Sequence, residues 1–228
     1  MIKEDIWTEL SKSYDEVLTR WSLYQEIRNR VINNFAQENK IYDQGCGSGI
    51  LTIDLALHGK EVYGIDSNPH MLARAFEKIK KHSLEDKVFI KEGEILDKHF
   101  EDNTFDGIIS NNVLYYVDNP KRLLEEAFRV LKKDKKIMIV GPKDDLNVEK
   151  IATHCYTEFQ DKGLLPEFQK HFDNVVECNK WLKENSKIKN TYTAEELSEI
   201  LIKIGFSEIL EKKEDIYLGF NYYILAKK

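Results

Sequence analysis

The feature that most constrains the fold of this chain is a group of three glycines set between a short apolar run and a helical pattern. The segment is Ile41-Tyr42-Asp43-Gln44-Gly45-Cys46-Gly47-Ser48-Gly49, which predicts a strand that turns sharply into a helix. Glycine permits such a turn and lets a ligand approach the main chain without a β-carbon in between. A tight strand-to-helix turn also uses glycine for structural reasons alone, so the loop by itself leaves binding and structural interpretations evenly matched.

The segments around this loop alternate between strand and helix patterns. Apolar and β-branched runs predict strands at 40–44, 61–66, 87–91, 105–110 and 136–140, with helical patterns between them at 50–57, 69–82 and 120–131. Strands and helices in alternation predict right-handed parallel crossovers and an open, doubly wound α/β sheet. Near the C-terminus, Thr193 and Glu196 form a capping box that opens a helix ending at Gly205. Two further strands, 206–212 and 220–226, predict an antiparallel hairpin and bring the mostly parallel sheet to seven strands.

Two helical regions accompany this core. Residues 1–38 carry apolar and aromatic side chains at three- and four-residue steps, which is typical of an amphipathic helical arm. Residues 143–190 are helical and aromatic, with no strand signal, and we expect an insertion that lies over the sheet edge as a lid. We therefore predict one domain, since 228 residues suit one substantial core. Its parts are the arm (1–38), a ligand-binding core (39–142), the lid insertion (143–190), and a terminal helix and hairpin (191–228).

An acidic residue ends the second predicted strand. Asp66 lies 21 positions after Gly45 (66 − 45), where doubly wound folds place a carboxylate against the two hydroxyls of a ribose. The competing interpretation is a helix N-cap, because Pro69 follows shortly. The spacing favours ligand binding over the cap.

The glycine register indicates which adenosine cofactor is bound. A dinucleotide fingerprint places its third glycine at position 50, but that residue is Ile50 and the glycine is at 49. Residues 43–49 contain no lysine or arginine to neutralise phosphates, and Asp43 would repel a pyrophosphate. A ligand without phosphates that carries an amino group and a sulfonium is better tolerated there.

The segment from Asp43 to Gly49 resembles the first motif of class I, Rossmann-like S-adenosylmethionine-dependent methyltransferases. It is most similar to the small-molecule group related to ubiquinone and menaquinone methyltransferases. The resemblance continues through Gly93-Glu94-Ile95, through 105–111 and through 124–132, and covers about Tyr14 to Gly141 plus the terminal helix and hairpin. One departure is Gln44, where the family usually has an apolar residue. The resemblance implies S-adenosylmethionine as cofactor and S-adenosylhomocysteine as product.

The resemblance also implies roles for the matching residues. The glycine loop would line the methionine and ribose portion, Asp66 would hold the ribose diol, and Glu94 and Ile95 would contact the adenine edge. Tyr14 resembles a tyrosine that many relatives fold over the cofactor, and Asn111 follows the fourth strand, where ligands gather in open α/β sheets. The expected cofactor-binding set is Tyr14, Asp43, Gly45, Cys46, Gly47, Gly49, Asp66, Ser67, Met71, Glu94, Ile95 and Asn111. Structural alternatives remain for Met71 as a core residue and for Asn111 as a turn residue.

Three residues are candidates for handling the methyl acceptor. Tyr115 and Tyr116 follow the fourth strand beside the expected methyl path, where one could orient an acceptor and the other is expected to be simply buried. His154, in the insertion, is a candidate base, although most lone histidines are structural or face solvent. Methyl transfer depends mainly on alignment and exclusion of water, so no base is obligatory. His154 and the adjacent Cys155 lack partner ligands, and we expect no metal.

The charge and the motifs of the chain limit the classes of methyl acceptor that we expect. The net charge is −6 without a basic block, and Asn111-Asn112-Val113-Leu114 stands where base-modifying members of the family carry Asn/Asp-Pro-Pro-aromatic. No apolar stretch approaches the roughly 20 residues that span a bilayer, and three widely spaced cysteines favour a reducing compartment. We expect a small-molecule acceptor methylated at oxygen, nitrogen or sulfur, no nucleic-acid or membrane partner, and a cytoplasmic monomer or homodimer. Two alternatives stay open: a non-catalytic module that binds the same cofactor, and a nicotinamide-dependent reductase, which the glycine register disfavours.

Overall fold

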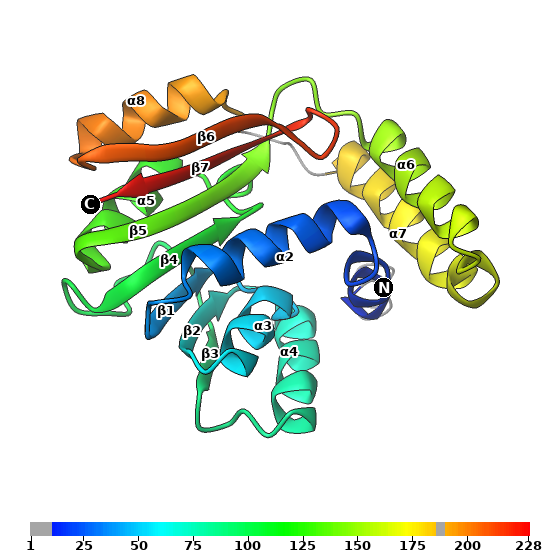
Figure 1. Cartoon of the computed structure of the whole chain (residues 1–228), viewed down its shortest axis with the longest axis horizontal. Coiled ribbons are helices and arrows are strands. Elements are labelled where there is room, and N and C mark those ends of the chain that lie inside the picture. The colour runs from blue at the N-terminus through cyan, green and yellow to red at the C-terminus, as the bar shows by residue number, and fades with distance from the viewer. Residues whose placement is uncertain (1–10, 186–189) are drawn as a thin grey trace.

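Seven strands form one mixed sheet in the order β3-β2-β1-β4-β5-β7-β6 (Figure 1). The computed structural model describes the backbone of residues 11–185 and 190–228 and the side chains of 11–177 and 190–228. β1 to β5 pair in parallel, whereas β7 runs antiparallel to both β5 and β6. The predicted doubly wound sheet with a C-terminal antiparallel hairpin is confirmed. The strands are β1 (Lys40–Gln44), β2 (Glu61–Asp66), β3 (Val88–Glu92), β4 (Phe105–Asn111), β5 (Leu131–Pro142), β6 (Glu208–Ile216) and β7 (Asn221–Lys227).

Helices cover both faces of the sheet, and alternation along each strand decides which core a side chain enters. In β1, Ile41 joins the core beneath α2, α3 and α4, while Tyr42 joins the core beneath α5 and α8. Asn68 and Asn119 cap α4 and α5, and each helix has proline at its first position. The helices are α2 (Ser22–Asn34), α3 (Ile50–Leu57), α4 (Pro69–Lys81), α5 (Pro120–Val130), α6 (Val148–Asp161), α7 (Leu165–Asn185) and α8 (Ala194–Ile204), preceded by a helix at residues 11–18.

Strand ends differ from the sequence prediction where pairing partners extend them. The strand expected at 136–140 spans Leu131–Pro142, because Leu131 pairs with Phe105 and Pro142 pairs with Asn221. The hairpin strand expected at 206–212 lies instead at 208–216, with two register shifts against β7. Phe206 is a buried core side chain that precedes the strand. These bounds depend on partners distant in sequence, which periodicity does not report.

The insertion packs on the N-terminal arm. Phe159 and Phe172, from α6 and α7, belong to the same core as Val17 and Trp21. Figure 1 places α6 and α7 beyond the carboxyl ends of the parallel strands, next to the N-terminal end of α2. The switch point between β1 and β4, where the strand order reverses direction across the sheet, therefore opens toward the arm and the insertion.

Among the described helices, none combines the length and the apolar character needed to cross a membrane.

Candidate cofactor and acceptor site

The glycine loop is held by main-chain hydrogen bonds across the β1–β2 edge. The Gly45 N–H donates to the Ile65 carbonyl over 2.9 Å, and the Gly49 N–H donates to the Cys46 carbonyl over 2.9 Å. Gly45 adopts a φ of +64°, and a β-carbon there would lie 2.7 Å from a Val113 methyl carbon. A side chain at this position would be both strained and overpacked, which accounts for the glycine.

Asp66 is tied to this loop by hydrogen bonds from the main chain. Its Oδ2 accepts from the Gly47 N–H and its Oδ1 from the Asn68 N–H, both over 2.8 Å. The helix-cap interpretation of Asp66 is wrong, because Asn68 caps α4 by accepting from the N–H groups of His70 and Met71. Burial raises the pKa of the Asp66 carboxyl, against the two main-chain donors that lower it. Each carboxylate oxygen retains a further acceptor site for a hydroxyl donor.

Gly47 leaves a gap between the side chains of Met71 and Asp66. A β-carbon on Gly47 would stand 3.4 Å from the Met71 methyl carbon and 4.0 Å from Asp66 Oδ2. Alanine at position 47 would therefore project into the space between these two side chains. The glycine keeps that space free for a ligand.

Asp43 is a buried carboxyl at the base of the same cavity. Its Oδ2 accepts a hydrogen bond from the Thr52 hydroxyl over 2.6 Å. Burial raises the pKa of Asp43 to about 7; the Thr52 bond opposes this shift and the Asp66 charge adds to it. A cationic ligand group nearby would favour the ionised carboxylate. A buried carboxyl at this position suits a cationic ligand group better than a phosphate.

The loop after β3 supplies the opposite end of the cavity. The Gly93 N–H donates to the Asp66 carbonyl over 3.0 Å, and His99 Nε2 lies 2.7 Å from the Glu94 carbonyl oxygen. These contacts position Glu94 and Ile95, which both line the cavity.

One cavity of about 530 Å³ collects the expected cofactor residues at the carboxyl ends of β1, β2 and β4. Gly49 alone of that set does not line it. Gly49 is the N-cap residue of α3, and a β-carbon there would lie 3.0 Å from Ala75 Cβ. The lining includes Tyr14, Asp43, Gly45, Cys46, Gly47, Asp66, Ser67, Met71, Glu94, Ile95 and Asn111.

Asn111 adds a buried acceptor without a partner. Its Oδ1 has no hydrogen-bond partner among the residues that the structure describes. Leaving such a group unsatisfied costs about 1–3 kcal/mol, so a ligand donor such as an ammonium group would be stabilised there. Gln44, the departure from the family pattern, has both side-chain polar atoms buried and without a hydrogen-bond partner in the described part of the chain, but it does not line the cavity.

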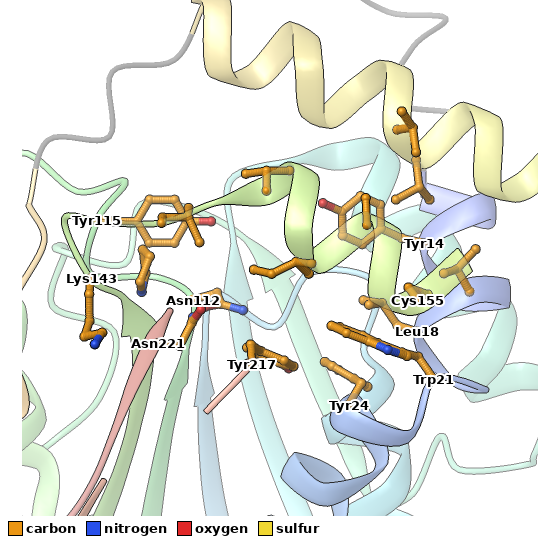
Figure 2. A pocket seen from close by; sticks show the side chains of 18 of the residues that line it. Tyr14, Leu18, Trp21, Tyr24, Asn112, Tyr115, Lys143, Cys155, Tyr217 and Asn221 are labelled. Carbon is orange, nitrogen blue, oxygen red and sulfur yellow. The ribbon is translucent and has the colours of Figure 1, made fainter. Parts of the chain in front are cut away.

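A second cavity, of about 430 Å³, adjoins the first (Figure 2). Tyr115 and Tyr116 line both cavities, with ring centroids 4.1 Å apart. Tyr115 is half-buried, and burial raises the pKa of its phenol, while Tyr116 is exposed. The residues common to both cavities are Tyr14, Leu18, Tyr24, Asn112, Tyr115 and Tyr116. Tyr24 and Asn112 are not among the site residues expected from the sequence, although Asn112 adjoins the predicted Asn111.

The two histidines of the insertion lie outside both cavity linings. The Trp21 indole N–H donates to His154 Nδ1 over 3.3 Å, so His154 stands behind the tryptophan wall. His171 Nδ1 contacts the Ser13 hydroxyl at 3.2 Å. The expected base role of His154 therefore has no geometric support. Within the described part of the chain, no cluster of His, Cys, Asp or Glu could hold a metal ion.

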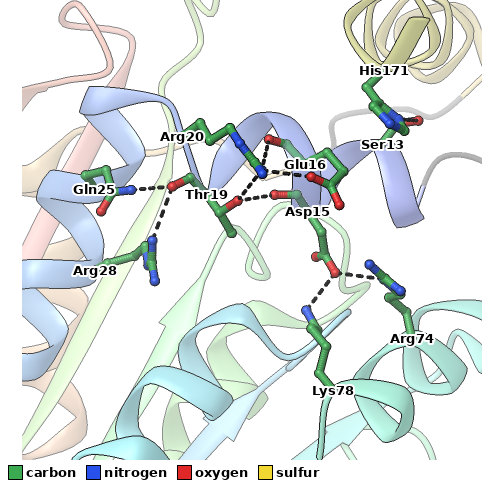
Figure 3. A network of polar contacts seen from close by, with 10 residues as sticks. All are labelled: Ser13, Asp15, Glu16, Thr19, Arg20, Gln25, Arg28, Arg74, Lys78 and His171. Carbon is green, nitrogen blue, oxygen red and sulfur yellow. Dashed lines mark hydrogen bonds and ion pairs between the residues drawn. The ribbon is translucent and has the colours of Figure 1, made fainter. Parts of the chain in front are cut away.

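Asp15 connects the arm to the glycine loop and to α4, and Figure 3 shows its contacts with Arg74 and Lys78 of α4. Its buried carboxylate accepts from the Ser48 hydroxyl over 2.5 Å, and from Arg74 Nε and Lys78 Nζ of α4 over 3.1 and 2.7 Å. Burial lowers the pKa of Lys78, and the Asp15 charge opposes that shift. The cluster holds Tyr14, the preceding residue, at the cavity wall. Sequence reasoning missed Asp15, because nothing local to it reports partners on α4.

Comparison with known proteins adds independent evidence. Residues 36–204 match the family model described as "Methyltransferase domain". The chain is 27% identical over 234 residues to a demethylmenaquinone methyltransferase of Lactobacillus johnsonii, covering 98% of this chain and 92% of the relative. It is also 27% identical to a carboxy-S-adenosyl-L-methionine synthase of Nitratiruptor, covering 94% of this chain and 88% of that protein.

Solved structures share the fold. The crystal structure of a SAM-dependent methyltransferase from Aquifex aeolicus superposes with a TM-score of 0.60 at 20% identity, covering 87% of this chain and 88% of that one. At 20% sequence identity, this structural similarity supports the fold alone.

Proposed function

This chain belongs to the class I S-adenosylmethionine-dependent methyltransferase domain family, and from that premise we propose that it methylates an oxygen, nitrogen or sulfur atom of a small molecule. The observation that carries the proposal is the pair of adjoining cavities with a common wall. The first suits the cofactor and the second would receive the acceptor, so the atom to be methylated would meet the cofactor at the common wall.

The residues of the first cavity fit the cofactor part by part. Asp66, beside the gap at Gly47, would bind the ribose diol, and Glu94 would face the adenine edge. Asn111 Oδ1 and the Asp43 carboxyl would receive the amino end of the methionine moiety. When bound, the cofactor supplies an electrophilic methyl group on a positively charged sulfur.

The protein's own contribution is alignment and exclusion of water. Tyr14 and Leu18, on the arm, and Tyr115, after β4, form a largely apolar boundary between the cavities. Holding the acceptor atom in line with the methyl group supplies most of what a displacement reaction requires. With His154 outside the cavity linings, polar groups of the common wall would orient the acceptor, among them the hydroxyls of Tyr115 and Tyr116 and the side chain of Asn112.

A small acceptor is favoured because the second cavity has about 430 Å³, within the range of pockets for drug-sized ligands. The small-molecule methyltransferases among the relatives support the same conclusion. The relative that makes carboxy-S-adenosyl-L-methionine keeps one alternative in view, namely a use of the cofactor other than methyl transfer.

The test is calorimetric titration of the purified chain with S-adenosylmethionine, S-adenosylhomocysteine and NADH, followed by incubation with a cell metabolite extract. We expect micromolar binding of the first two, none of NADH, and extract-dependent release of S-adenosylhomocysteine. Binding without release would favour a non-catalytic module or another use of the cofactor. Absence of binding would overturn the proposed cofactor site.

A further inference from the structure

The second cavity is apolar on one side and polar on the other. Trp21, Tyr24 and Phe172 contribute aromatic side chains to its lining, and Leu18 and Ile151 contribute aliphatic ones. In Figure 2, Lys143, Asn112 and Asn221 lie toward the opposite side from Leu18, Trp21, Tyr24 and Cys155. A ligand that fills this space therefore needs an apolar body, suited to aromatic contact, and a polar substituent at one end.

Lys143 is the cation at the polar end. Its main-chain N–H donates to the Phe220 carbonyl over 2.9 Å, which fixes its backbone against the β6–β7 turn directly after β5. No hydrogen bond or ion pair of its ammonium group is found among the described residues, in contrast to Lys78, which is paired with Asp15. The other charged residue of the lining is Asp144, which is exposed to solvent. The half-buried Lys143 is thus available to a ligand anion.

The position of Lys143 determines where in the lining a ligand anion would bind. Lys143 lines the second cavity but not the cofactor cavity, whereas Tyr14, Asn112 and Tyr115 line both. An anion bound to Lys143 would lie against a part of the lining that belongs to the second cavity alone, on the same side as Asn112 and Tyr115 of the common wall (Figure 2).

We propose, on the basis of the function proposed above, that this cavity binds a ring-containing organic anion, anchored by its acidic group on Lys143. The acidic group is of the carboxylate or sulfonate type. An anion in a largely apolar cavity is strongly disfavoured unless it is paired, so the lysine determines which acceptors are held. The aromatic wall accepts the ring, and the pairing fixes which edge of it faces the cofactor.

The experiment uses two fluorescent probes with the same ring skeleton. 8-Anilinonaphthalene-1-sulfonate carries an anionic group, and N-phenyl-1-naphthylamine lacks it. Both are titrated into the full chain in the presence of S-adenosylhomocysteine. We expect Lys143→Met to weaken binding of the sulfonate probe about tenfold, corresponding to about 1.4 kcal/mol, and to leave the neutral probe within about twofold.

Three variants make the result specific. Lys143→Arg keeps the charge and should retain sulfonate binding. Lys133→Met removes the same charge from an exposed position outside the cavity lining and should change neither probe. Ala152→Phe fills the cavity and should weaken both, which locates the probes there.

Two outcomes would overturn the inference: sulfonate binding that Lys143→Met leaves unchanged, or equal loss of both probes in that variant while it still binds S-adenosylhomocysteine. Failure of the cofactor assignment appears separately, as loss of calorimetric S-adenosylhomocysteine binding in the unaltered protein. The probe comparison can then be repeated without cofactor.

Discussion

The Asp15 cluster predicts how firmly the arm closes over the cofactor cavity. Asp15→Asn keeps the shape of the side chain and its hydrogen bond from Ser48, but removes the charge that faces Arg74 and Lys78. The arm then loses its ionic attachment to α4. Tyr14, which lines both cavities, would be less firmly placed.

The expected loss of docking free energy follows from how deeply the charged side chains are buried. The Asp15 side chain is 6% exposed and Lys78 is 16% exposed, so their pair lies closer to the buried class, where breaking one partner costs about 3–5 kcal/mol. Arg74 is 25% exposed and keeps an ion pair with Glu77, which reduces the loss. We therefore expect Asp15→Asn to destabilise docking of the arm by about 2 kcal/mol, or roughly thirtyfold in its opening equilibrium.

Limited trypsin proteolysis under native conditions measures this opening through cleavage after Arg20, and urea unfolding measures the whole domain. The matched control is Glu16→Gln, which breaks the ion pair of Glu16 with Arg20 on the arm. In that pair the side chains are 27% and 39% exposed, so its loss should cost less than about 0.5 kcal/mol. Equal cleavage rates for Asp15→Asn and Glu16→Gln would refute the reasoning that the buried cluster holds the arm.

Three further predictions concern the cofactor cavity. Asp66→Ala should weaken S-adenosylhomocysteine binding by about 1.5–3 kcal/mol in calorimetry, the scale of charge-assisted hydrogen bonds, and an unchanged affinity would place the ribose elsewhere. Gly47→Ala should cost about 1–2 kcal/mol in urea unfolding because of its φ of +54°, and should lower cofactor affinity at least tenfold (about 1.4 kcal/mol) because the new methyl group occupies the gap beside Asp66. Burial raises the pKa of Asp43 to about 7, so the folded state keeps this proton to higher pH than the unfolded state. Its contribution to stability is therefore full below about pH 4 and is lost as pH rises toward 7. Asp43→Asn should flatten that decline in urea midpoints between pH 5 and pH 8, and an unaltered slope would assign the dependence to other groups.

The sequence alone was enough for the features that depend on local geometry. Three glycines between a strand and a helix, with Asp66 at the end of the next strand, predicted the cofactor loop because turns and ligand approach are restricted within a few residues. Alternating strand and helix patterns predicted the parallel sheet, because a strand-helix-strand crossover has one favoured handedness. The cavity then contained these residues, apart from Gly49.

Tertiary structure alone decided the features that depend on distant partners. Asp15 contacts Lys78, 63 positions away in the sequence, and Trp21 contacts His154, 133 positions away. The local sequence therefore predicts neither the attachment of the arm nor the position of His154 outside the site. The length of β5 was likewise set by pairing with β4 and β7, and the register of β6 by pairing with β7. The acceptor cavity exists only where the arm, the insertion and the strand ends pack together, because a cavity is a property of their joint packing and no single segment encodes its shape.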